Sequence, residues 1–236
     1  MQTDTLNSLR ISGLLGSIYQ SKNQYQKSLN YYQEAMQLCQ QGGYMDRYFK
    51  ILFNSTTTLV DLGRYNTALE KMLECQKYFE AQERHDNVAV LHNNLGLLYL
   101  ENLNEPDKAK NQFDKAIAIN KKANNQWNLA RNYNNLSLVY ISKGLLDSAN
   151  YYLDQAIAKR KQENSEAGLA TLYNAKGELY LKLKDYSTAV QFFQKSQDIS
   201  KRYGITEGLY FTNIALGIAY DSLGTVTEPR VILTMP

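Results

Sequence analysis

The segment from Leu91 to Phe113, LHNNLGLLYLENLNEPDKAKNQF, holds the pattern that decides the fold. A small residue, Gly96, is followed three positions later by a large one, Tyr99. A second small residue, Ala109, is followed four positions later by Phe113. Because spacings of three and four residues lie on one face of a helix, the segment predicts two amphipathic helices joined by a short turn.

The same pattern recurs along the chain. The first small residue is spaced by 40, 40, 41, 40 and 40 positions, in the pairs Gly16 with Tyr19, Thr56 with Leu59, Gly96 with Tyr99, Ser137 with Tyr140, Gly177 with Tyr180, and Gly217 with Tyr220. After the first five pairs come small, large and small residues in turn: Ser28, Tyr32 and Ala35; Ala68, Met72 and Cys75; Ala109, Phe113 and Ala116; Ala149, Leu153 and Ala156; Ala189, Phe193 and Ser196. A fixed period of this length indicates a stack of repeated helix pairs.

Close packing between helices explains the pattern. Two antiparallel helices approach closely only where one offers a small side chain, and a large residue of the other then fills the gap. Glycine inside a helix costs about 0.5–1 kcal/mol relative to alanine, yet four of the six copies keep it. The one extra residue of the third repeat is expected in its turn, Glu101–Pro106, where an insertion costs least.

Three copies of the motif resemble tetratricopeptide (TPR) repeats: Leu15-Gly16-x-x-Tyr19, Leu95-Gly96-x-x-Tyr99 and Leu216-Gly217-x-x-Tyr220. The period exceeds the roughly 34 residues of the standard repeat. It is similar to the long-helix branch found in kinesin light chains, bacterial peptide-sensing regulators and sensory regions of bacterial kinases. The resemblance implies an all-α fold, an α-solenoid of about five and a half antiparallel helix-pair repeats that forms a right-handed superhelix.

We expect one helical array over residues 1–223, followed by a non-repeat tail at 224–236. The expected repeats are 5–43, 44–84, 85–124, 125–164 and 165–204, with a half repeat at 205–223. In the tail, Val231-Ile232-Leu233 favours an extended conformation. The last helix has little polar face, since it carries Phe211, Ile214 and Ile218. Three alternatives remain open: the tail covers this face, the face docks on a partner, or the chain is part of a longer kinase or transcription regulator.

The resemblance also implies that the first helix of each pair lines a concave inner face. The middle of this face is polar and slightly basic. An asparagine amide both donates and accepts hydrogen bonds, which suits the backbone of an extended peptide, while Lys50 and Arg131 favour an acidic side chain or a terminal carboxylate. The candidate peptide-binding residues are Arg10, Lys50, Asn54, Asn93, Asn94, Arg131, Asn134, Asn135 and Asn174. The alternative is a solvated inner face in an asparagine-rich protein.

Two further features have an ordinary explanation and a more specific one. Basic residues recur near the ends of the second helices: Lys121-Lys122, Lys159-Arg160-Lys161 and Lys201-Arg202. They are expected to compensate the helix C-terminal charge, the alternative being a basic edge for an acidic partner. Trp127 is expected to be a packing anchor at the start of a helix.

The sequence predicts no catalytic, cofactor or metal site. Cys39 and Cys75 form no CxxC motif, and His85 and His92 have no accompanying ligand set. No P-loop, GxSxG or GxGxxG motif occurs. The formal net charge of +3 gives no case for nucleic acid. Without a long apolar run or signal-peptide features at Met1–Thr5, a cytoplasmic location without membrane insertion is expected.

Together these features predict a protein- or peptide-binding scaffold that is not an enzyme and uses the concave face of its repeats. A narrower version makes it the sensory or regulatory part of a bacterial signalling system. The alternative is a structural module that self-associates through the apolar last helix.

Overall fold

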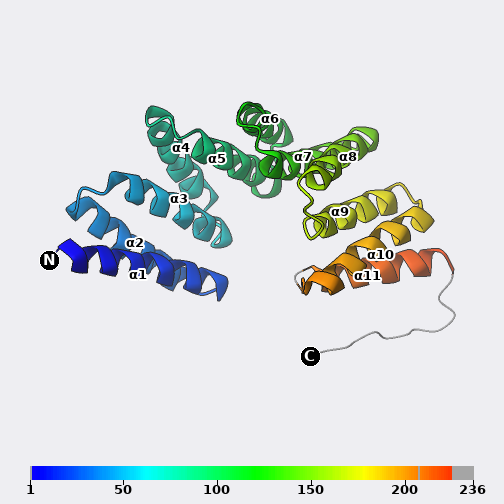
Figure 1. Cartoon of the computed structure of the whole chain (residues 1–236), viewed down its shortest axis with the longest axis horizontal. Helices are drawn as coiled ribbons and strands as arrows, with labels where there is room; N and C mark the ends of the chain where they lie inside the picture. The colour runs from blue at the N-terminus through cyan, green and yellow to red at the C-terminus, as the bar shows by residue number, and fades with distance from the viewer. Residues whose placement is uncertain (1, 207, 225–236) are drawn as a thin grey trace. The chain divides into compact units, whose positions relative to one another are not determined.

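The computed structural model describes residues 2–206 and 208–224, and the side chains from residue 6 onward. This part of the chain is all helical and contains no strand, which confirms the predicted fold class (Figure 1). The helices are α1 (Gln2–Ser21), α2 (Tyr25–Gln41), α3 (Met45–Asp61), α4 (Tyr65–Ala81), α5 (His85–Leu97) continued by the π-helical η1 (Leu98–Asn102), α6 (Pro106–Lys122), α7 (Gln126–Ser142), α8 (Leu146–Gln162), α9 (Leu169–Lys182), α10 (Tyr186–Tyr203) and α11 (Leu209–Ser222). The expected extended segment Val231-Ile232-Leu233 lies outside the described residues.

The helices fall into two compact units, residues 1–119 and 120–236. Within each unit, helices that follow one another in the chain pack together, as α1 does on α2, α2 on α3, α7 on α8, and α9 on α10. Such nearest-neighbour packing is typical of a solenoid. The limits of the individual repeats remain a prediction.

The loops are nearly identical along the first eight helices. Each loop is three residues long, and its middle residue has positive φ. In six of these seven loops the N–H of the third residue donates to the carbonyl five residues back, as from Gln24 to Tyr19 (2.8 Å) and from Leu145 to Tyr140 (2.9 Å), and after η1 Glu105 N–H donates to Tyr99, six residues back (2.7 Å). This bond reverses the chain directly after the helix. Glycine or asparagine, the residues that tolerate this conformation best, occupies every one of these middle positions except Glu83.

The predicted contact between small and large residues holds within the first, third and fifth helix pairs. A Cβ atom added at Gly16 would lie 2.6 Å from the ring of Tyr32. Added at Gly96 or Gly177, it would lie 2.5 Å from the ring of Phe113 or Phe193, respectively. The three rings are almost fully buried, so they cannot readily withdraw. Close approach of an aromatic ring to the helix backbone therefore explains why glycine stands there.

The extra residue of the third repeat lies inside its first helix and not in its turn, so the expected place was wrong. The helix from His85 to Asn102 ends in the π-helical segment η1, and the turn after it has the same three-residue length as the others. Leu103 N–H donates to the carbonyl of Leu98, five residues back (3.1 Å), whereas Lys143 N–H donates to Val139, four back (3.2 Å). A π turn takes up one residue without lengthening the loop.

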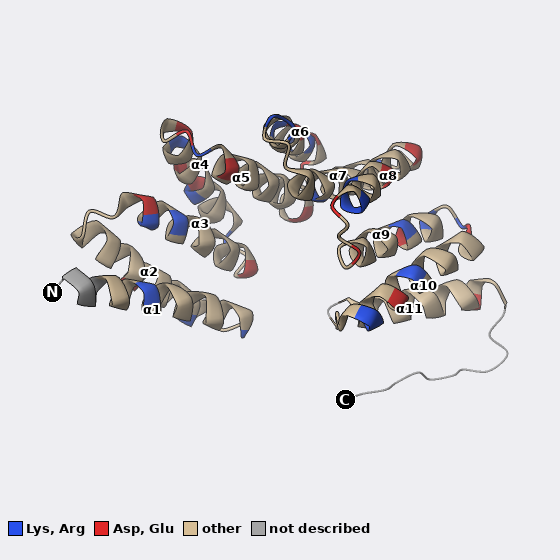
Figure 2. Ribbon diagram, in the orientation of Figure 1, with Lys and Arg blue, Asp and Glu red and all other residues tan. Residues whose placement is uncertain are grey.

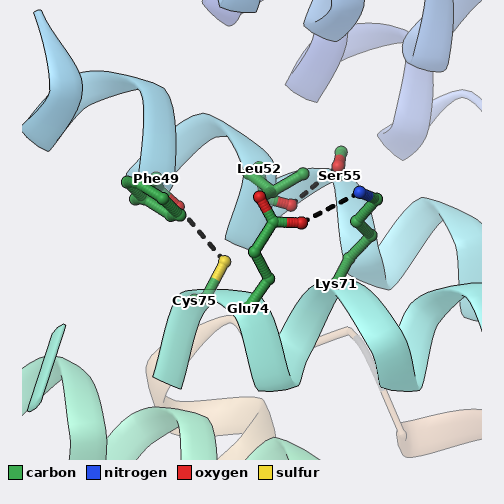
Figure 3. A network of polar contacts seen from close by, with 6 residues as sticks. All are labelled: Phe49, Leu52, Ser55, Lys71, Glu74 and Cys75. Atoms are coloured by element: carbon green, nitrogen blue, oxygen red, sulfur yellow. Dashed lines mark hydrogen bonds and ion pairs between the residues drawn. The ribbon is translucent and has the colours of Figure 1, made fainter. Parts of the chain in front are cut away.

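Small residues of the second helices also contact the neighbouring backbone. The Cys75 thiol of α4 donates to the carbonyl of Phe49 in α3 (3.6 Å), beside the contacts of Ser55 and Lys71 (Figure 3). Ser196 of α10 donates in the same way to the carbonyl of Ala170 in α9 (2.8 Å). Burial raises the pKa of the Cys75 thiol to about 12. The thiol is thus a packing group, as the sequence predicted, and not a nucleophile.

The glycine contacts predict opposite effects for two matched substitutions in α9 and α11. Gly177→Ala should lower the free energy of unfolding by about 1–3 kcal/mol, because its Cβ would overlap the ring of Phe193. Gly217 has no atom within 4 Å of an added Cβ, so Gly217→Ala should raise it by about 0.5–1 kcal/mol. Urea denaturation measures both values. Changes of the same sign would contradict the packing argument.

The π turn predicts that one residue can be removed from α5–η1 without loss of the fold. Deletion of Glu101 should restore the α-helical hydrogen-bond ladder and leave the helical circular dichroism and the unfolding midpoint nearly unchanged. Deletion of Ser142, at the regular end of α7, is the control. It should rotate the following turn by about 100° and destabilise the protein by on the order of 2 kcal/mol or more. Equal losses from the two deletions would contradict this account.

Candidate peptide-binding face and arginine cluster

The candidate residues of the first unit lie on α1, α3 and α5 and differ in exposure. Arg10, Lys50 and Asn54 are exposed, and Asn94 is half-buried. Asn93 is only 1% exposed, and its amide nitrogen donates to the amide oxygen of Asn94 (3.3 Å). In this unit a ligand could directly contact Arg10, Lys50, Asn54 and Asn94, whereas the side chain of Asn93 is out of reach.

In the second unit, the candidates lie on α7 and α9. Asn135 is buried, whereas Arg131, Asn134 and Asn174 are half-buried. The Asn174 amide donates to Glu178 (2.7 Å) and accepts from the hydroxyl of Thr212 in α11 (2.8 Å). Asn174 is therefore already engaged by its neighbours, and a ligand would have to compete with these bonds.

Residues Arg131 and Asn134 are one helical turn apart on α7 and differ from the other candidates. The Nε of Arg131 and the Oδ1 of Asn134 are buried, yet neither has a hydrogen-bond partner in the protein. A buried polar group left without a partner costs about 1–3 kcal/mol. Burial also lowers the pKa of Arg131, because a low-dielectric surrounding disfavours the charged form.

A second arginine, Arg160, lies beside this part of α7. It belongs to the basic last turn of α8, Lys159-Arg160-Lys161 (Figure 2). Unlike its exposed neighbour Lys161, Arg160 is only 8% exposed, and its guanidinium carbon lies 3.5 Å from the ring centre of Trp127. The expectation that this residue only compensates the helix end is therefore too simple, because a buried guanidinium stacked on tryptophan interacts mainly with the ring.

Trp127 also differs from the expected packing anchor, because it is 50% exposed. The Arg160 guanidinium stacks on one face of the Trp127 ring. Because Trp127 is the only tryptophan in the sequence, its fluorescence is a probe of this group of residues. We define the arginine cluster as Trp127, Arg131 and Arg160.

Sequence reasoning missed Arg160 although a signal was present. Ala149, Leu153 and Ala156 form the buried stripe of α8, and Arg160 continues it four residues further on. The equivalent positions in the other complete repeats are also buried: Cys39, Phe79, Asn120 and Ser200. Helical spacing could thus have placed Arg160 in the core, but its charge directed the interpretation to the surface.

The described residues show no other chemical centre. Among residues 2–206 and 208–224, no group of three or more histidine, cysteine, aspartate or glutamate side chains could hold a metal ion. His92 is buried, with Nδ1 2.7 Å from the amide oxygen of Gln112, whereas His85 is exposed. In the same part of the chain, every helix is too short or too polar to cross a bilayer.

Comparison of the sequence with family models identifies the repeats. Models described as tetratricopeptide repeat match residues 12–43, 89–122, 129–166 and 170–203, which together cover more than half of the chain. No curated protein matches the sequence.

Solved structures share the fold at low sequence identity. BtubC (BKLC) from P. vanneervenii is 21% identical with a TM-score of 0.71, over 85% of each chain. A Podosopora anserina kinesin light chain with nearly identical TPR-like repeats is 15% identical with a TM-score of 0.66, over 83% of this chain and 96% of that one. The Rap conjugation gene regulator of plasmid pLS20, in complex with the Phr* peptide, is 14% identical with a TM-score of 0.79. That match covers 92% of this chain, which spans only 60% of the regulator.

Proposed function

Because the chain belongs to the tetratricopeptide repeat family, we propose that it is a non-catalytic scaffold that binds an extended peptide or protein segment through the first helices of its repeats. The observation that carries this proposal is the pair of buried polar atoms on α7 without partners, Nε of Arg131 and Oδ1 of Asn134. The Arg131 Nε–H can donate a hydrogen bond, and the Asn134 Oδ1 can accept one. A peptide backbone offers both complementary groups, so its binding, with a local rearrangement that exposes these two atoms, would remove the cost of leaving them unpaired.

The candidate residues divide by accessibility within this proposal. Within the first unit Arg10, Lys50, Asn54 and Asn94, and within the second unit Arg131 and Asn134, are exposed or half-buried, and each set is proposed to contact a ligand. Asn93, Asn135 and Asn174 are proposed to act through their neighbours or after local rearrangement, because burial or existing hydrogen bonds occupy them. The Rap regulator with its bound Phr* peptide supports a peptide as one class of ligand for this fold. It also supports the narrower role in a bacterial signalling system.

The proposal predicts that loss of single asparagine amides weakens binding. A random-peptide display selection would supply a ligand, and calorimetry would then compare its Kd for wild type, Asn94→Ala and Asn134→Ala. Each substitution should weaken binding by about 10-fold, the equivalent of one hydrogen bond. Asn66→Ala, an exposed asparagine on α4, is the control and should leave the Kd unchanged. If both test variants keep wild-type affinity and wild-type circular dichroism, this face is not the binding site.

A second candidate function is self-association through α11. One face of this helix packs on α10 through Leu216 and Ala219, while Phe211 is 69% exposed and Ile218 is 54% exposed. Gly217 supports this reading, because no aromatic ring fills the space beside it as one does at Gly177. The open glycine face could receive an aromatic side chain from a helix of a second copy.

This alternative predicts association that depends on concentration and on Phe211. Sedimentation velocity from low to high micromolar concentration should show dimers or larger species, and Phe211→Glu should return the protein to monomers. Tyr151→Glu, at another exposed aromatic residue, on α8, should have no effect. Wild-type protein that stays monomeric over the whole range rejects self-association and leaves the peptide-binding proposal untouched.

A further inference from the structure

The arginine cluster holds more positive charge than its surroundings compensate. Among the described residues, Glu163 is the acidic group that acts on Arg160, and its Oε2 lies 3.7 Å from the Arg160 Nη1, too far for a hydrogen bond. That Nη1 atom is buried and has no hydrogen-bond partner in the protein. Arg131, in turn, has no ion pair among the described residues. One carboxylate thus acts on Arg160 from a distance, and none in the described part of the chain acts on Arg131.

The two arginines are close enough to affect each other. Burial lowers the pKa of Arg160, the carboxylate of Glu163 partly opposes this, and the positive charge of Arg131 lowers the pKa further. Both groups still carry a proton at neutral pH, because the guanidinium group of arginine is not deprotonated in proteins. Their repulsion is therefore present in the folded protein, and a bound anion would relieve it.

The cluster is held in place by its neighbours. Trp127 covers one face of the Arg160 guanidinium at 3.5 Å. The backbone of Gly168, just before α9, closes in on the same side chain, since an added Cβ there would lie 3.0 Å from the Arg160 Cδ. An arginine fixed between a ring and a backbone segment has lost its conformational freedom before any ligand arrives, which favours directional binding.

We propose that Arg131 and Arg160 form a carboxylate-binding subsite that receives an acidic side chain or the C-terminus of the bound peptide, with Trp127 positioning Arg160. This subsite rests on the proposed peptide-binding function and specifies its ligand class. Guanidinium groups bind carboxylates through charge-assisted, often bidentate hydrogen bonds. Charge balance favours a carboxylate over a phosphate: two arginines and Glu163 leave one net positive charge, which a monoanion neutralises and a dianion would exceed.

The test uses the intact chain and sodium acetate as the probe, with Trp127 fluorescence as the readout. Trp127 is the only tryptophan in the sequence, so the signal comes from the cluster. Acetate should change the fluorescence saturably and raise the unfolding temperature beyond the effect of sodium chloride at equal ionic strength. Arg131→Gln should weaken the acetate response by 10-fold or more. Lys161→Gln removes the same charge from an exposed neighbour of Arg160 and should keep the full response.

The stability of the substituted protein separates a binding role from a structural one. Without acetate, Arg131→Gln should unfold at or above the wild-type temperature, because it removes an uncompensated charge that makes no hydrogen bond in the protein. A drop of about 3 °C or more would assign Arg131 a structural role and overturn the proposal. An equal acetate response in wild type and Arg131→Gln, or none beyond that of chloride, would overturn it as well.

Peptides selected by display distinguish the two sources of the carboxylate. Amidation of the peptide C-terminus should weaken binding by 10-fold or more if the terminus occupies the subsite, and exchange of an acidic residue for its amide should do so if a side chain does. Peptides that bind with no loss from either change would overturn the subsite while the proposed function stands. An arginine-dependent acetate response in a chain that binds no peptide would instead support an anion site and reject the proposed function.

Discussion

The contact between an aromatic ring and the glycine face of the preceding helix determines how three of the five complete repeats pack. Tyr32, Phe113 and Phe193 each occupy space that a single methyl group on the facing glycine would take away. Such a ring is large enough to bury much apolar area, and the missing Cβ lets the helix backbones approach it. The other small residues of the motif, at Ala109, Ala149 and Ala189, are fully buried and allow the same close approach from the second helix.

Because this contact lies in the middle of the helices, the number of residues at a helix end can differ between repeats. The third repeat adds one residue and still ends in a three-residue turn, because the π turn of η1 accommodates the extra residue between Tyr99 and Glu105. The packing of Gly96 on Phe113 lies before that turn and is unaffected. The insertion is thus absorbed at the C-terminal end of the helix, after the glycine contact and without lengthening the loop.

Polar residues replace apolar ones at one core position of the third and fourth repeats. The position that is Cys39 and Phe79 in the first repeats is Asn120 and Arg160 in the third and fourth. The Asn120 side-chain amide of α6 donates to Asn132 of α7 (2.8 Å). Arg160 instead stacks on Trp127 and is affected by the positive charge of Arg131. A repeat fold can carry such a substitution, because its stability is spread over many similar interfaces.

The sequence by itself determined the helix pairs, their period and the packing of Gly96 and Gly177, because these depend on spacing along single helices and on side-chain size. It also placed Arg131 and Asn134 among the candidate ligand-binding residues. Only the tertiary structure decided that Asn93 and Asn135 are buried, that the extra residue forms a π turn, and that Arg160 stacks on Trp127. These features depend on how neighbouring helices rotate about their axes and on which polar atoms find a partner, and residue spacing in one helix does not specify either.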